Sequence, residues 1–392
     1  MRIVNVVGAR PNFVKIAPLI QEMRRHPTMG PILVHTGQHY DGPMSEQLFT
    51  DLEIPPPDFN LGVGSGSHAV QTAEVIRRLE PVLTTTRPDL VLVVGDVNST
   101  LAAALTAVKM AIPVAHVEAG LRSFDRTMPE EINRLLTDAV SDFLFVTEES
   151  GRENLLREGI APEKIHFVGN VMIDALRASR PRWEVSSVFS RLGINPDHPY
   201  AVLTLHRPSN VDDPATLTDF LDALHELARH LPIIFPLHPR VRQQLGRNGY
   251  MPPAKPERAE ALQSKGLAYL DPLGYLDFIA LMSRARLVLT DSGGIQEETT
   301  ILGVPCLTLR ETTERPITVT HGTNRVIGTD PARIVLEARR TLDHPPQPPG
   351  PPPLWDGQAA RRIVTVLTGM FGANGHSRAG HDSAALNAVV RT

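Results

Sequence analysis

The feature that most constrains the fold of this chain is a repeated alternation between short apolar runs and helical patterns. Each apolar run ends in glycine or in a polar residue, and an amphipathic stretch follows it. This repetition is typical of βα units and predicts mostly parallel sheets that are covered by helices on both faces. The apolar runs span residues 3–8, 32–37, 90–96, 113–120, 143–147, 165–169, 200–206, 233–238, 287–292, 304–310 and 325–328.

The alternation is interrupted by an Arg-rich helical stretch near residues 171–190 and then restarts. Since a chain of 392 residues has room for two domains of about 150 residues each, we expect an α/β fold with two Rossmann-like domains and a ligand cleft between them. The proline-dominated segment 345–353 predicts a stiff, extended connection. The expected division is 1–172 for the N-terminal domain, 173–353 for the C-terminal domain, 354–371 for a helix that crosses back to the first domain, and 372–392 for a disordered tail.

The overall composition excludes several classes of protein. Hydrophobic residues make up 42% of the chain and charged residues 21%, as in ordinary globular proteins. The formal net charge of -4 offers no general attraction to nucleic acid or to an anionic membrane. No apolar stretch approaches the roughly 20 residues needed to span a bilayer, and the start MRIVNVVGAR lacks the features of a signal peptide. We therefore expect a cytoplasmic protein without nucleic-acid or membrane partners.

Two glycine turns at predicted helix starts could hold phosphate groups. The first strand ends in Gly8-Ala9-Arg10-Pro11 and leads to Lys15, and two cations at a helix amino end suit a diphosphate. The second turn, Thr290-Asp291-Ser292-Gly293-Gly294, opens a helix that carries Glu298, which could accept hydrogen bonds from ribose hydroxyls. The simpler structural explanations are a surface Arg and Lys in the first case and, for Glu298, an acid that stabilises the helix dipole.

Acidic residues gather at strand ends and at a helix start in the first domain. They occur in Gly95-Asp96-Val97-Asn98-Ser99-Thr100, His116-Val117-Glu118-Ala119-Gly120 and Met128-Pro129-Glu130-Glu131-Ile132. Each acid alone could be structural, and Glu130 and Glu131 after Pro129 fit simple helix capping. Together the acids suggest general acid/base chemistry, because carboxylates in one desolvated cleft shift one another's pKa values and can supply both a base and an acid.

Histidines end two strands of the second domain, in His206-Arg207-Pro208-Ser209-Asn210 and in Pro236-Leu237-His238-Pro239-Arg240. A lone histidine at a strand end is usually a satisfied polar residue, but two such turns beside a glycine turn favour nucleotide binding. Arg315, in Thr312-Thr313-Glu314-Arg315-Pro316, could clamp the nucleotide or could be a solvated loop charge.

The motifs of the common cofactor sites do not occur in the sequence. No GxGxxG turn follows the first strand and no GxxxxGK[ST] occurs, so no NAD or other cofactor is expected. No tight spacing of His, Cys or Asp indicates a metal site. The single cysteine, Cys306, lies in the apolar sequence Val304-Pro305-Cys306-Leu307, which indicates a buried strand rather than a reactive thiol.

The chain contains, in order, GARPNFVKIAPL, TGQHYD, GDVNST, HVEAGLRS, MPEEINR, VGNVMID, LHRPSNV, PLHPR, TDSGGIQEE and TERP. These motifs resemble those of the non-hydrolysing UDP-N-acetylglucosamine 2-epimerases, which share the two-domain architecture of the GT-B glycosyltransferases. The resemblance extends from residue 8 to about residue 316. It implies anti elimination of UDP across C1 and C2 to give 2-acetamidoglucal, followed by re-addition with C2 inverted, without a redox cofactor.

The resemblance also implies roles for individual residues. Asp96, Glu118 and Glu130 resemble the acid/base carboxylates, with Glu131 as the substitute for Glu130, and His206 resembles an active-site residue that touches the departing nucleotide. The residues that resemble ligands of uridine diphosphate are Arg10, Lys15, His238, Ser292, Gly293, Gly294, Glu298 and Arg315.

The motif Gln38-His39-Tyr40-Asp41 is similar to one that some members use to bind a second UDP-N-acetylglucosamine molecule as an activator. It implies allosteric contacts through Gln38 and His39. Family analogy adds a homodimer and a role in cell-surface polysaccharide biosynthesis.

The chain departs from the family pattern at two motifs. Ala9-Arg10-Pro11-Asn12 stands where many members carry TRPE, and His206-Arg207-Pro208-Ser209-Asn210 stands where many carry HRREN. These changes keep open another UDP-2-acetamido sugar as the substrate, such as a diacetamido uronic acid. The sequence is also compatible with a hydrolysing epimerase that releases N-acetylmannosamine and UDP, with a GT-B glycosyltransferase and with a non-catalytic nucleotide-sugar sensor. The three acids of the first domain argue against the last two of these functions.

Overall fold

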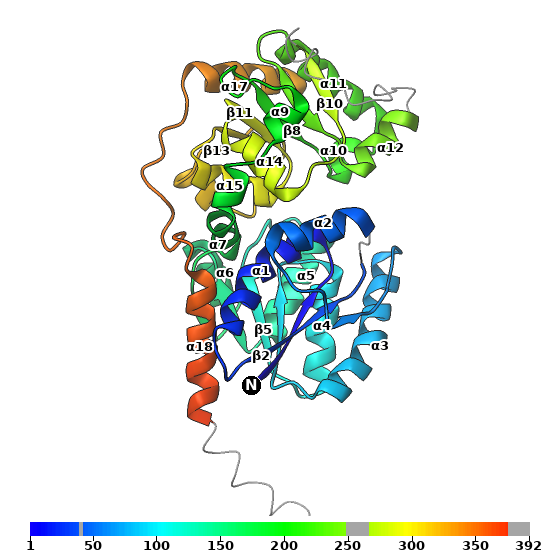
Figure 1. Cartoon of the computed structure of the whole chain (residues 1–392), viewed down its shortest axis with the longest axis vertical. Coiled ribbons are helices and arrows are strands. Elements are labelled where there is room, and N and C mark those ends of the chain that lie inside the picture. Colours follow the sequence, from blue (N-terminus) through cyan, green and yellow to red (C-terminus); the bar gives the residue numbers. More distant parts are fainter. Residues whose placement is uncertain (39–41, 248–265, 375–392) are drawn as a thin grey trace, which may run out of the picture.

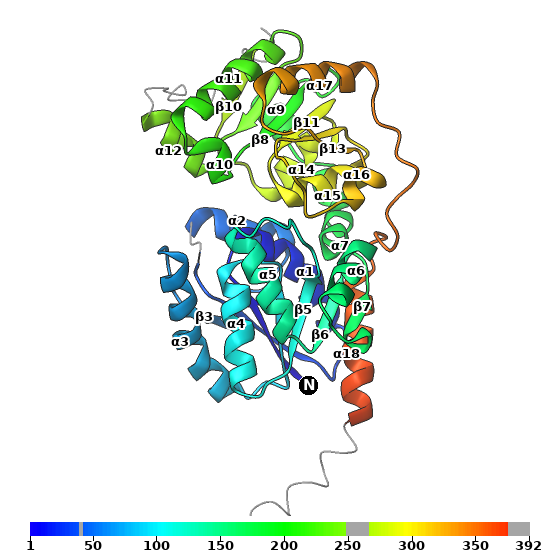
Figure 2. The ribbon, with the colours of Figure 1, turned by 180° about the vertical axis from the view of Figure 1, so that it is seen from behind.

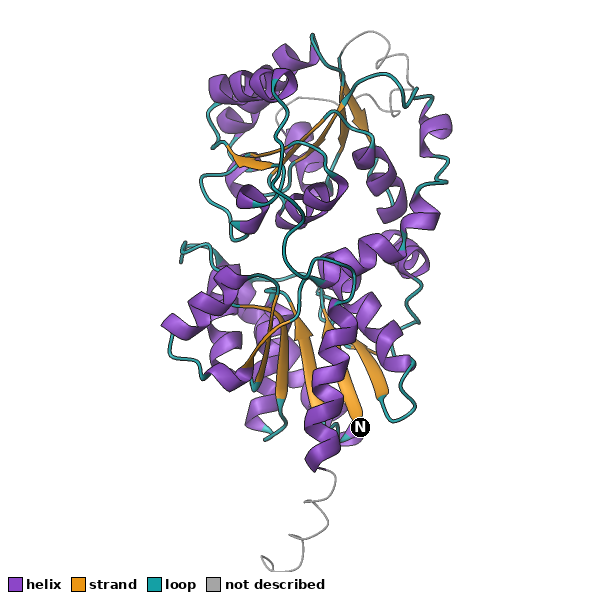
Figure 3. Cartoon of the chain, turned by 90° about the vertical axis from the view of Figure 1, so that its left-hand side faces the viewer, coloured by secondary structure: helices purple, strands orange, loops and turns teal. Residues whose placement is uncertain are grey.

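The computed structural model describes residues 1–38, 42–247 and 266–374 and shows two α/β lobes, one above the other in Figure 1. Each lobe contains one sheet, and the described strands pair in parallel with their neighbours. Figure 3 shows the strands of both sheets with helices on either side. The prediction of an α/β fold with two Rossmann-like sheets is therefore confirmed.

The first lobe contains a 7-stranded sheet in the order β3-β2-β1-β4-β5-β6-β7. Its strands are β1 (Arg2–Val7), β2 (Gly30–His35), β3 (Phe59–Asn60), β4 (Leu90–Val94), β5 (Val114–Ala119), β6 (Phe143–Val146) and β7 (Ile165–Phe167). The predicted strands of this lobe are all present, and β3 was not predicted. The strand order reverses between β1 and β4, so the loops that follow these two strands diverge and leave a crevice for a ligand.

Helices cover both faces of this sheet, as the continuous apolar strands require. Ile3 and Val7 pack on one side with Ile16, whereas Val4 and Val6 pack on the other side with Leu79. Figure 2 shows α3 and α4 over the second of these faces. The helices of the lobe are α1 (Arg10–Arg24), α2 (Gly42–Leu52), α3 (His68–Thr86), α4 (Asn98–Lys109), α5 (Pro129–Val140) and α6 (Glu149–Arg157).

The second lobe contains a 6-stranded sheet in the order β10-β9-β8-β11-β12-β13. Its strands are β8 (Ala201–Thr204), β9 (Ile233–Pro236), β10 (Leu267–Leu270), β11 (Leu287–Thr290), β12 (Cys306–Thr308) and β13 (Asn324–Val326). Its helices are α10 (Pro208–Val211), α11 (Pro214–Ala228), α12 (Pro239–Arg247), α14 (Tyr275–Ser283), α15 (Gly293–Leu302), α16 (Ile317–Thr320) and α17 (Pro331–Asp343). Only β10 among the strands of this lobe was not predicted. Cys306 is buried in β12, as predicted, and burial raises the pKa of its thiol to about 12.

The Arg-rich stretch between the lobes forms α7 (Val171–Ala178), α8 (Arg180–Trp183) and α9 (Val188–Leu192). After α17, the proline-rich segment runs as an extended connection to α18 (Ala359–Asn374), which packs against α1 and α7 of the first lobe (Figure 1). Asp174 of α7 caps α18, because its carboxylate accepts hydrogen bonds from the amides of Ala359 at 3.1 Å and Ala360 at 2.7 Å. The domain boundaries stay a prediction, and the tail beyond residue 374 lies outside the described residues.

None of the helices within residues 1–38, 42–247 and 266–374 has both the length and the apolar character that a membrane span needs.

Candidate active site

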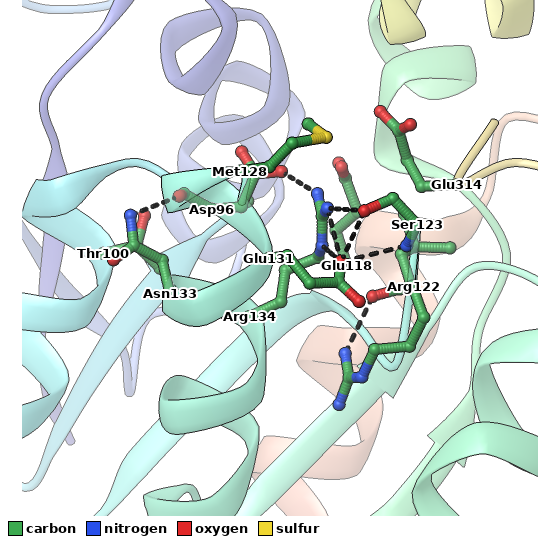
Figure 4. A network of polar contacts seen from close by, with 12 residues as sticks. Asp96, Thr100, Glu118, Arg122, Ser123, Met128, Glu131, Asn133, Arg134 and Glu314 are labelled. Carbon is green, nitrogen blue, oxygen red and sulfur yellow. Dashed lines mark hydrogen bonds and ion pairs between the residues drawn. The ribbon is translucent and has the colours of Figure 1, made fainter. Parts of the chain in front are cut away.

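The candidate site lies where the carboxyl ends of the first sheet meet the second lobe. Parallel strands all end at the same edge of a sheet, so Asp96 after β4 and Glu118 on β5 are brought to one edge. Helix α5, which carries Glu130 and Glu131 in its first turn, begins beside them. Figure 4 shows Asp96, Glu118 and Glu131 converging around the Arg134 guanidinium. The structure therefore brings together the acids predicted from the sequence.

Glu118 owes its position to an irregularity in its strand. The pairing register between β5 and β6 shifts between Val117 and Ala119, and Glu118 has a φ of 76°. A positive φ is uncommon in a residue other than glycine and persists only where the surroundings impose it. The buried carboxylate of Glu118 lies 2.6 Å from Lys15 Nζ and 2.6 Å from Arg315 Nη2. The bulge therefore aims a carboxylate between two cations that belong to different lobes.

Lys15 reaches Glu118 because the residue beside it, Gly95, has no side chain. Gly95 has a φ of 68°, and a Cβ at this residue would lie 3.1 Å from Lys15 Nζ. A larger residue would therefore strain the backbone and crowd the ammonium group. The absence of a side chain at Gly95 leaves room for Lys15 beside Glu118.

Asp96 is held by Arg134 of α5. Arg134 Nη1 lies 2.5 Å from Asp96 Oδ2, and Arg134 Nη2 lies 2.7 Å from Glu131 Oε2. Burial alone would raise the pKa of Asp96, but the positive charges of Arg134, Lys15 and Arg315 lower it below its usual value. Asp96 is therefore ionised at neutral pH and, with its side chain 23% exposed, remains accessible from the cleft.

The adjacent acids Glu130 and Glu131 differ sharply in their surroundings. Glu131 is buried and accepts hydrogen bonds from the amides of Ser123 and Phe124, from the Ser123 hydroxyl and from Arg134. Glu130 is half-buried, and it forms no hydrogen bond or ion pair within the part of the chain that the structure describes. Glu131 therefore holds the loop before α5, whereas the carboxylate of Glu130 has no hydrogen-bond or ion-pair partner among the described residues.

Arg315 joins the two lobes through a cluster of buried carboxylates. Its guanidinium lies 2.6 Å from Glu118, 2.6 Å from Glu297 of α15 and 2.8 Å from Glu314. Burial would lower the pKa of Arg315, but these three carboxylates raise it well above its usual value. In the same cluster, burial raises the pKa of Glu297, and burial raises the pKa of Glu148 to about 7.

The Ser-Gly-Gly turn lies at the start of α15, directly after β11. Ser292 is the N-cap residue, and Gly293 and Gly294 form the first turn, so their amides face outward from the positive end of the helix. A Cβ at Gly293 would lie only 2.4 Å from Arg315 Nη1 and 2.9 Å from a Glu314 carboxylate oxygen. Glycine at this position therefore lets the turn and Arg315 approach each other at the cleft.

His206 is oriented by a buried aspartate. His206 Nδ1 lies 2.7 Å from Asp291 Oδ1, and Asp291 also accepts hydrogen bonds from the amides of His206 and Arg207. Burial would raise the pKa of Asp291, but the His206 imidazole and these hydrogen bonds lower it to about 2. Because Nδ1 of His206 faces this carboxylate, its Nε2 is the ring nitrogen left for a ligand.

His238 lies next to the pair formed by His206 and Asp291. Its ring centroid is 5.9 Å from that of His206. Burial lowers the pKa of His238 to about 4, and the nearby charges of His206 and Arg10 contribute. His238 is therefore neutral at neutral pH and can act as a hydrogen-bonding group rather than as a cation.

Comparison with known proteins identifies the family. The family model described as UDP-N-acetylglucosamine 2-epimerase matches residues 21–368. The chain belongs to this family. The epimerase is 40% identical over 377 residues to a UDP-N-acetylglucosamine 2-epimerase of Methanococcus maripaludis, which covers 93% of this chain and 97% of that protein. The family membership predicted from the ordered motifs is thus confirmed. The members of this family are isomerases.

A second relative and a solved structure also match most of this chain. The epimerase is 41% identical over 376 residues to a UDP-2,3-diacetamido-2,3-dideoxy-D-glucuronate 2-epimerase of Pseudomonas aeruginosa, which covers 94% of this chain and 99% of that protein. A crystal structure of the Methanocaldococcus jannaschii UDP-GlcNAc 2-epimerase in complex with UDP-GlcNAc and UDP superimposes with a TM-score of 0.85. It is 39% identical and covers 94% of this chain and 99% of that one. The two-lobed GT-B architecture predicted for the epimerase is therefore confirmed.

The remaining predicted site residues of the epimerase have different surroundings. Arg10 is the first residue of α1 and lies close enough to His238 to affect its pKa. Glu298 is buried in α15, and burial raises its pKa to about 8. Gln38 is also buried, and its side-chain oxygen accepts hydrogen bonds from the Ser99 amide and hydroxyl. His39 lies outside the described residues.

Sequence reasoning did not assign roles to Arg134, Asp291 or Glu297, which the structure places in the candidate site. Each lies inside a motif that was recognised, and Asp291 and Glu297 directly adjoin an assigned residue. The spacing of Glu131 and Arg134, three residues apart on a helix, could have indicated the ion pair that they form. Within the described residues, no group of three or more His, Cys, Asp and Glu side chains could hold a metal ion.

Proposed function

We propose that this chain catalyses the reversible 2-epimerisation of UDP-N-acetylglucosamine to UDP-N-acetylmannosamine by the non-hydrolysing route. UDP leaves by anti elimination, 2-acetamidoglucal forms, and UDP then adds back with C2 inverted. The observation that supports this proposal most strongly is that Asp96 and Glu118 lie at one sheet edge and are each paired with cations. Glu118 also contacts Arg315, which adjoins the Ser292-Gly293-Gly294 turn of the second lobe.

The proposed reaction places clear demands on the site. In the elimination, a base removes the C2 proton, the C2–H electrons form the C1=C2 bond, and the C1–O bond breaks so that UDP leaves with its electron pair. In the return step, UDP adds to C1 while a proton reaches C2 on the opposite face. Two proton-transfer groups near C2 are therefore needed, and no net oxidation occurs.

We assign the acid/base roles to Asp96, Glu118 and Glu130. Asp96 is ionised and accessible, and Glu118 lies between Lys15 and Arg315. Between the adjacent acids of α5 we favour Glu130, because the oxygens of Glu131 already accept hydrogen bonds from the loop and from Arg134. We assign proton transfer to this set as a whole, without dividing the faces of C2 among its members.

The uridine diphosphate would be held mainly by the second lobe. The amides of the Ser292-Gly293-Gly294 turn would donate hydrogen bonds to phosphate oxygens, and the Glu298 carboxyl group would accept hydrogen bonds from the ribose hydroxyls. Arg10, Lys15 and Arg315 supply positive charge, and His206 and His238 supply ring nitrogens. These groups would stabilise the negative charge that develops on the departing diphosphate, which lowers the barrier rather than only tightening substrate binding.

A second candidate substrate is a UDP-2-acetamido uronic acid. The observation in its favour is the 41% identity to the Pseudomonas aeruginosa diacetamidoglucuronate 2-epimerase. Activation by a second UDP-N-acetylglucosamine molecule, a homodimer, a cytoplasmic location and a role in cell-surface polysaccharide biosynthesis complete the proposal as predictions from the sequence. A purely hyperbolic dependence of rate on substrate would argue against the activator.

The substrate is tested by a panel assay. The purified protein is incubated without nicotinamide cofactor with UDP-N-acetylglucosamine or with UDP-2,3-diacetamido-2,3-dideoxy-D-glucuronate, and products are separated by chromatography and identified by mass and NMR. We expect a reversible mixture of UDP-N-acetylglucosamine and UDP-N-acetylmannosamine. Turnover of the uronate alone would move the assignment to the second candidate, and irreversible release of N-acetylmannosamine and UDP would move it to the hydrolysing branch.

A further inference from the structure

A buried ion pair that the proposed mechanism does not use lies behind the acid/base residues. His116 of β5 and Asp138 of α5 are both inaccessible to solvent, and His116 Nδ1 lies 2.6 Å from Asp138 Oδ1. The other ring nitrogen, Nε2, lies 2.8 Å from the Gly95 carbonyl oxygen. Because a carbonyl oxygen can only accept, Nε2 carries a proton.

The carboxylate of Asp138 has further partners. It accepts a hydrogen bond from the Gly120 amide at 3.0 Å and lies 2.7 Å from Arg122 Nη2. Burial would raise the pKa of Asp138, but His116 and Arg122 lower it below its usual value. Asp138 is therefore ionised, and the 2.6 Å contact requires a proton on His116 Nδ1 as well. Both ring nitrogens of His116 are thus engaged, Nδ1 with the Asp138 carboxylate and Nε2 with the Gly95 carbonyl oxygen.

The partners of this pair all belong to segments that carry the acid/base residues. Gly95 directly precedes Asp96. His116 and Gly120 stand two residues before and two residues after Glu118. Asp138 lies on α5, the helix that carries Glu130 in its first turn. One pair of side chains therefore connects the loop after β4, the end of β5 and α5.

We propose that the His116–Asp138 pair is a positioning element of the acid/base site, which fixes Asp96, Glu118 and α5 relative to one another. A buried ion pair is weak evidence for stability, because apolar side chains of similar size often pack as well. What the ions add is direction: each hydrogen bond fixes one backbone group, the Gly95 carbonyl or the Gly120 amide. Proton transfer at carbon depends steeply on such geometry, and a misplacement of about 1 Å can lower a rate about 100-fold.

The chain offers a matched pair of variants at His116. An asparagine amide nitrogen lies near the position of the histidine Nδ1, so His116→Asn can keep the Asp138 contact and loses the Gly95 contact. A glutamine amide nitrogen lies near the position of Nε2, so His116→Gln can keep the Gly95 contact instead. Leu79→Ala is the control, because Leu79 is fully buried between α3 and the other face of the sheet. All three are compared below their melting temperatures.

The proposal rests on the epimerase function for its kinetic test. We expect His116→Asn to lower kcat about 10- to 100-fold with KM changed less than about 3-fold, because the second lobe holds the nucleotide. We expect His116→Gln to retain more of kcat than His116→Asn, and UDP affinity measured by calorimetry to be the same in all variants. The proposal is overturned if His116→Asn loses no more kcat than Leu79→Ala.

A second readout does not need turnover. In wild-type protein labelled with ¹⁵N, we expect two slowly exchanging ring protons from one histidine, and both should vanish in His116→Asn. A crystal structure of that variant should show the Gly95 carbonyl and the Asp96–Arg134 pair displaced. If the wild type epimerises no sugar of the panel, the proposed function fails, yet these two measurements still test the positioning. A single ring proton, or an unmoved Asp96, would overturn it.

Discussion

Arg315 Nη2 in the second lobe lies 2.6 Å from Glu118 Oε1 in the first lobe, across 197 positions of sequence. The same carboxylate also binds Lys15 Nζ. Both cations are proposed to bind the diphosphate of the substrate, so Glu118 and the diphosphate share their partners. The proposal therefore gives Glu118 two roles, as a proton-transfer group and as a competitor for the cations that would bind the diphosphate.

Glu118→Gln separates these two roles. We expect kcat to fall about 100- to 10,000-fold, the range typical of a lost acid/base group. We expect UDP affinity, measured by calorimetry, to be unchanged or higher, because a neutral amide competes less well for Lys15 and Arg315. Glu153→Gln on the exposed surface of α6 is the control and should leave both quantities unchanged. A variant that turns over normally, or that loses UDP binding together with kcat, would refute the assignment.

Gly293→Ala tests the close approach of the glycine turn to Arg315. The added Cβ would lie 2.4 Å from Arg315 Nη1, so either the turn or the guanidinium must shift. We expect at least about a tenfold loss of UDP affinity, comparable to the loss of one charged hydrogen bond. Gly369→Ala in α18 is the matched control, since no atom lies within 4 Å of its added Cβ. Equal UDP affinity in the two variants would be inconsistent with this role of the turn.

Asp291→Asn tests the His206–Asp291 pair through the free energy of unfolding at low pH. The pKa of Asp291 is about 2 in the folded protein against 3.8 ordinarily, so its ionised form stabilises the fold. This contribution, about 2 kcal/mol, is fully present above pH 4 and is lost as the pH falls through 2. We therefore expect the difference in free energy of unfolding between wild type and variant to shrink by this amount between pH 5 and pH 2. A difference that does not change with pH would contradict the prediction.

Glu148→Gln should act in the opposite direction at higher pH. Burial raises the pKa of Glu148 from 4.5 to about 7, so the fold is stabilised relative to the unfolded chain while this group is protonated. That advantage is present below pH 4.5 and is lost as the pH rises through 7, at a cost of about 3 kcal/mol. We expect the melting temperature of the variant to rise relative to wild type between pH 5 and pH 8. Glu149→Gln at the exposed neighbouring residue should show no such trend.

The fold followed closely from the sequence because its main features are local. The alternation of apolar runs and helical patterns identified the strands of both sheets except β3 and β10. Phe59–Asn60 is too short for any periodicity, and the apolar run Leu267–Leu270 fits a buried helix as well as a strand. The parallel arrangement of the strands was then sufficient to predict that Asp96 and Glu118 lie at one edge of the sheet.

The partners of these acids could not be predicted in the same way. The contacts of Glu118 depend on a bulge in β5 and on the packing of the second lobe against the first, and neither feature has a local pattern. Glu130 and Glu131 look equivalent in the sequence, but the loop before α5 and Arg134 occupy only Glu131. The His116–Asp138 pair likewise joins residues from a strand and a helix that meet only in the folded chain.

The measurement that tests the central claim most directly follows the sugar by proton NMR in deuterated water. The protein is incubated with UDP-N-acetylglucosamine alone, without nicotinamide cofactor. The account predicts UDP-N-acetylmannosamine with deuterium at C2, formed together with C2-deuterated starting material, because a solvent-exchanged proton returns to C2. Epimerised product that retains the original hydrogen at C2 would contradict the proposed elimination and re-addition.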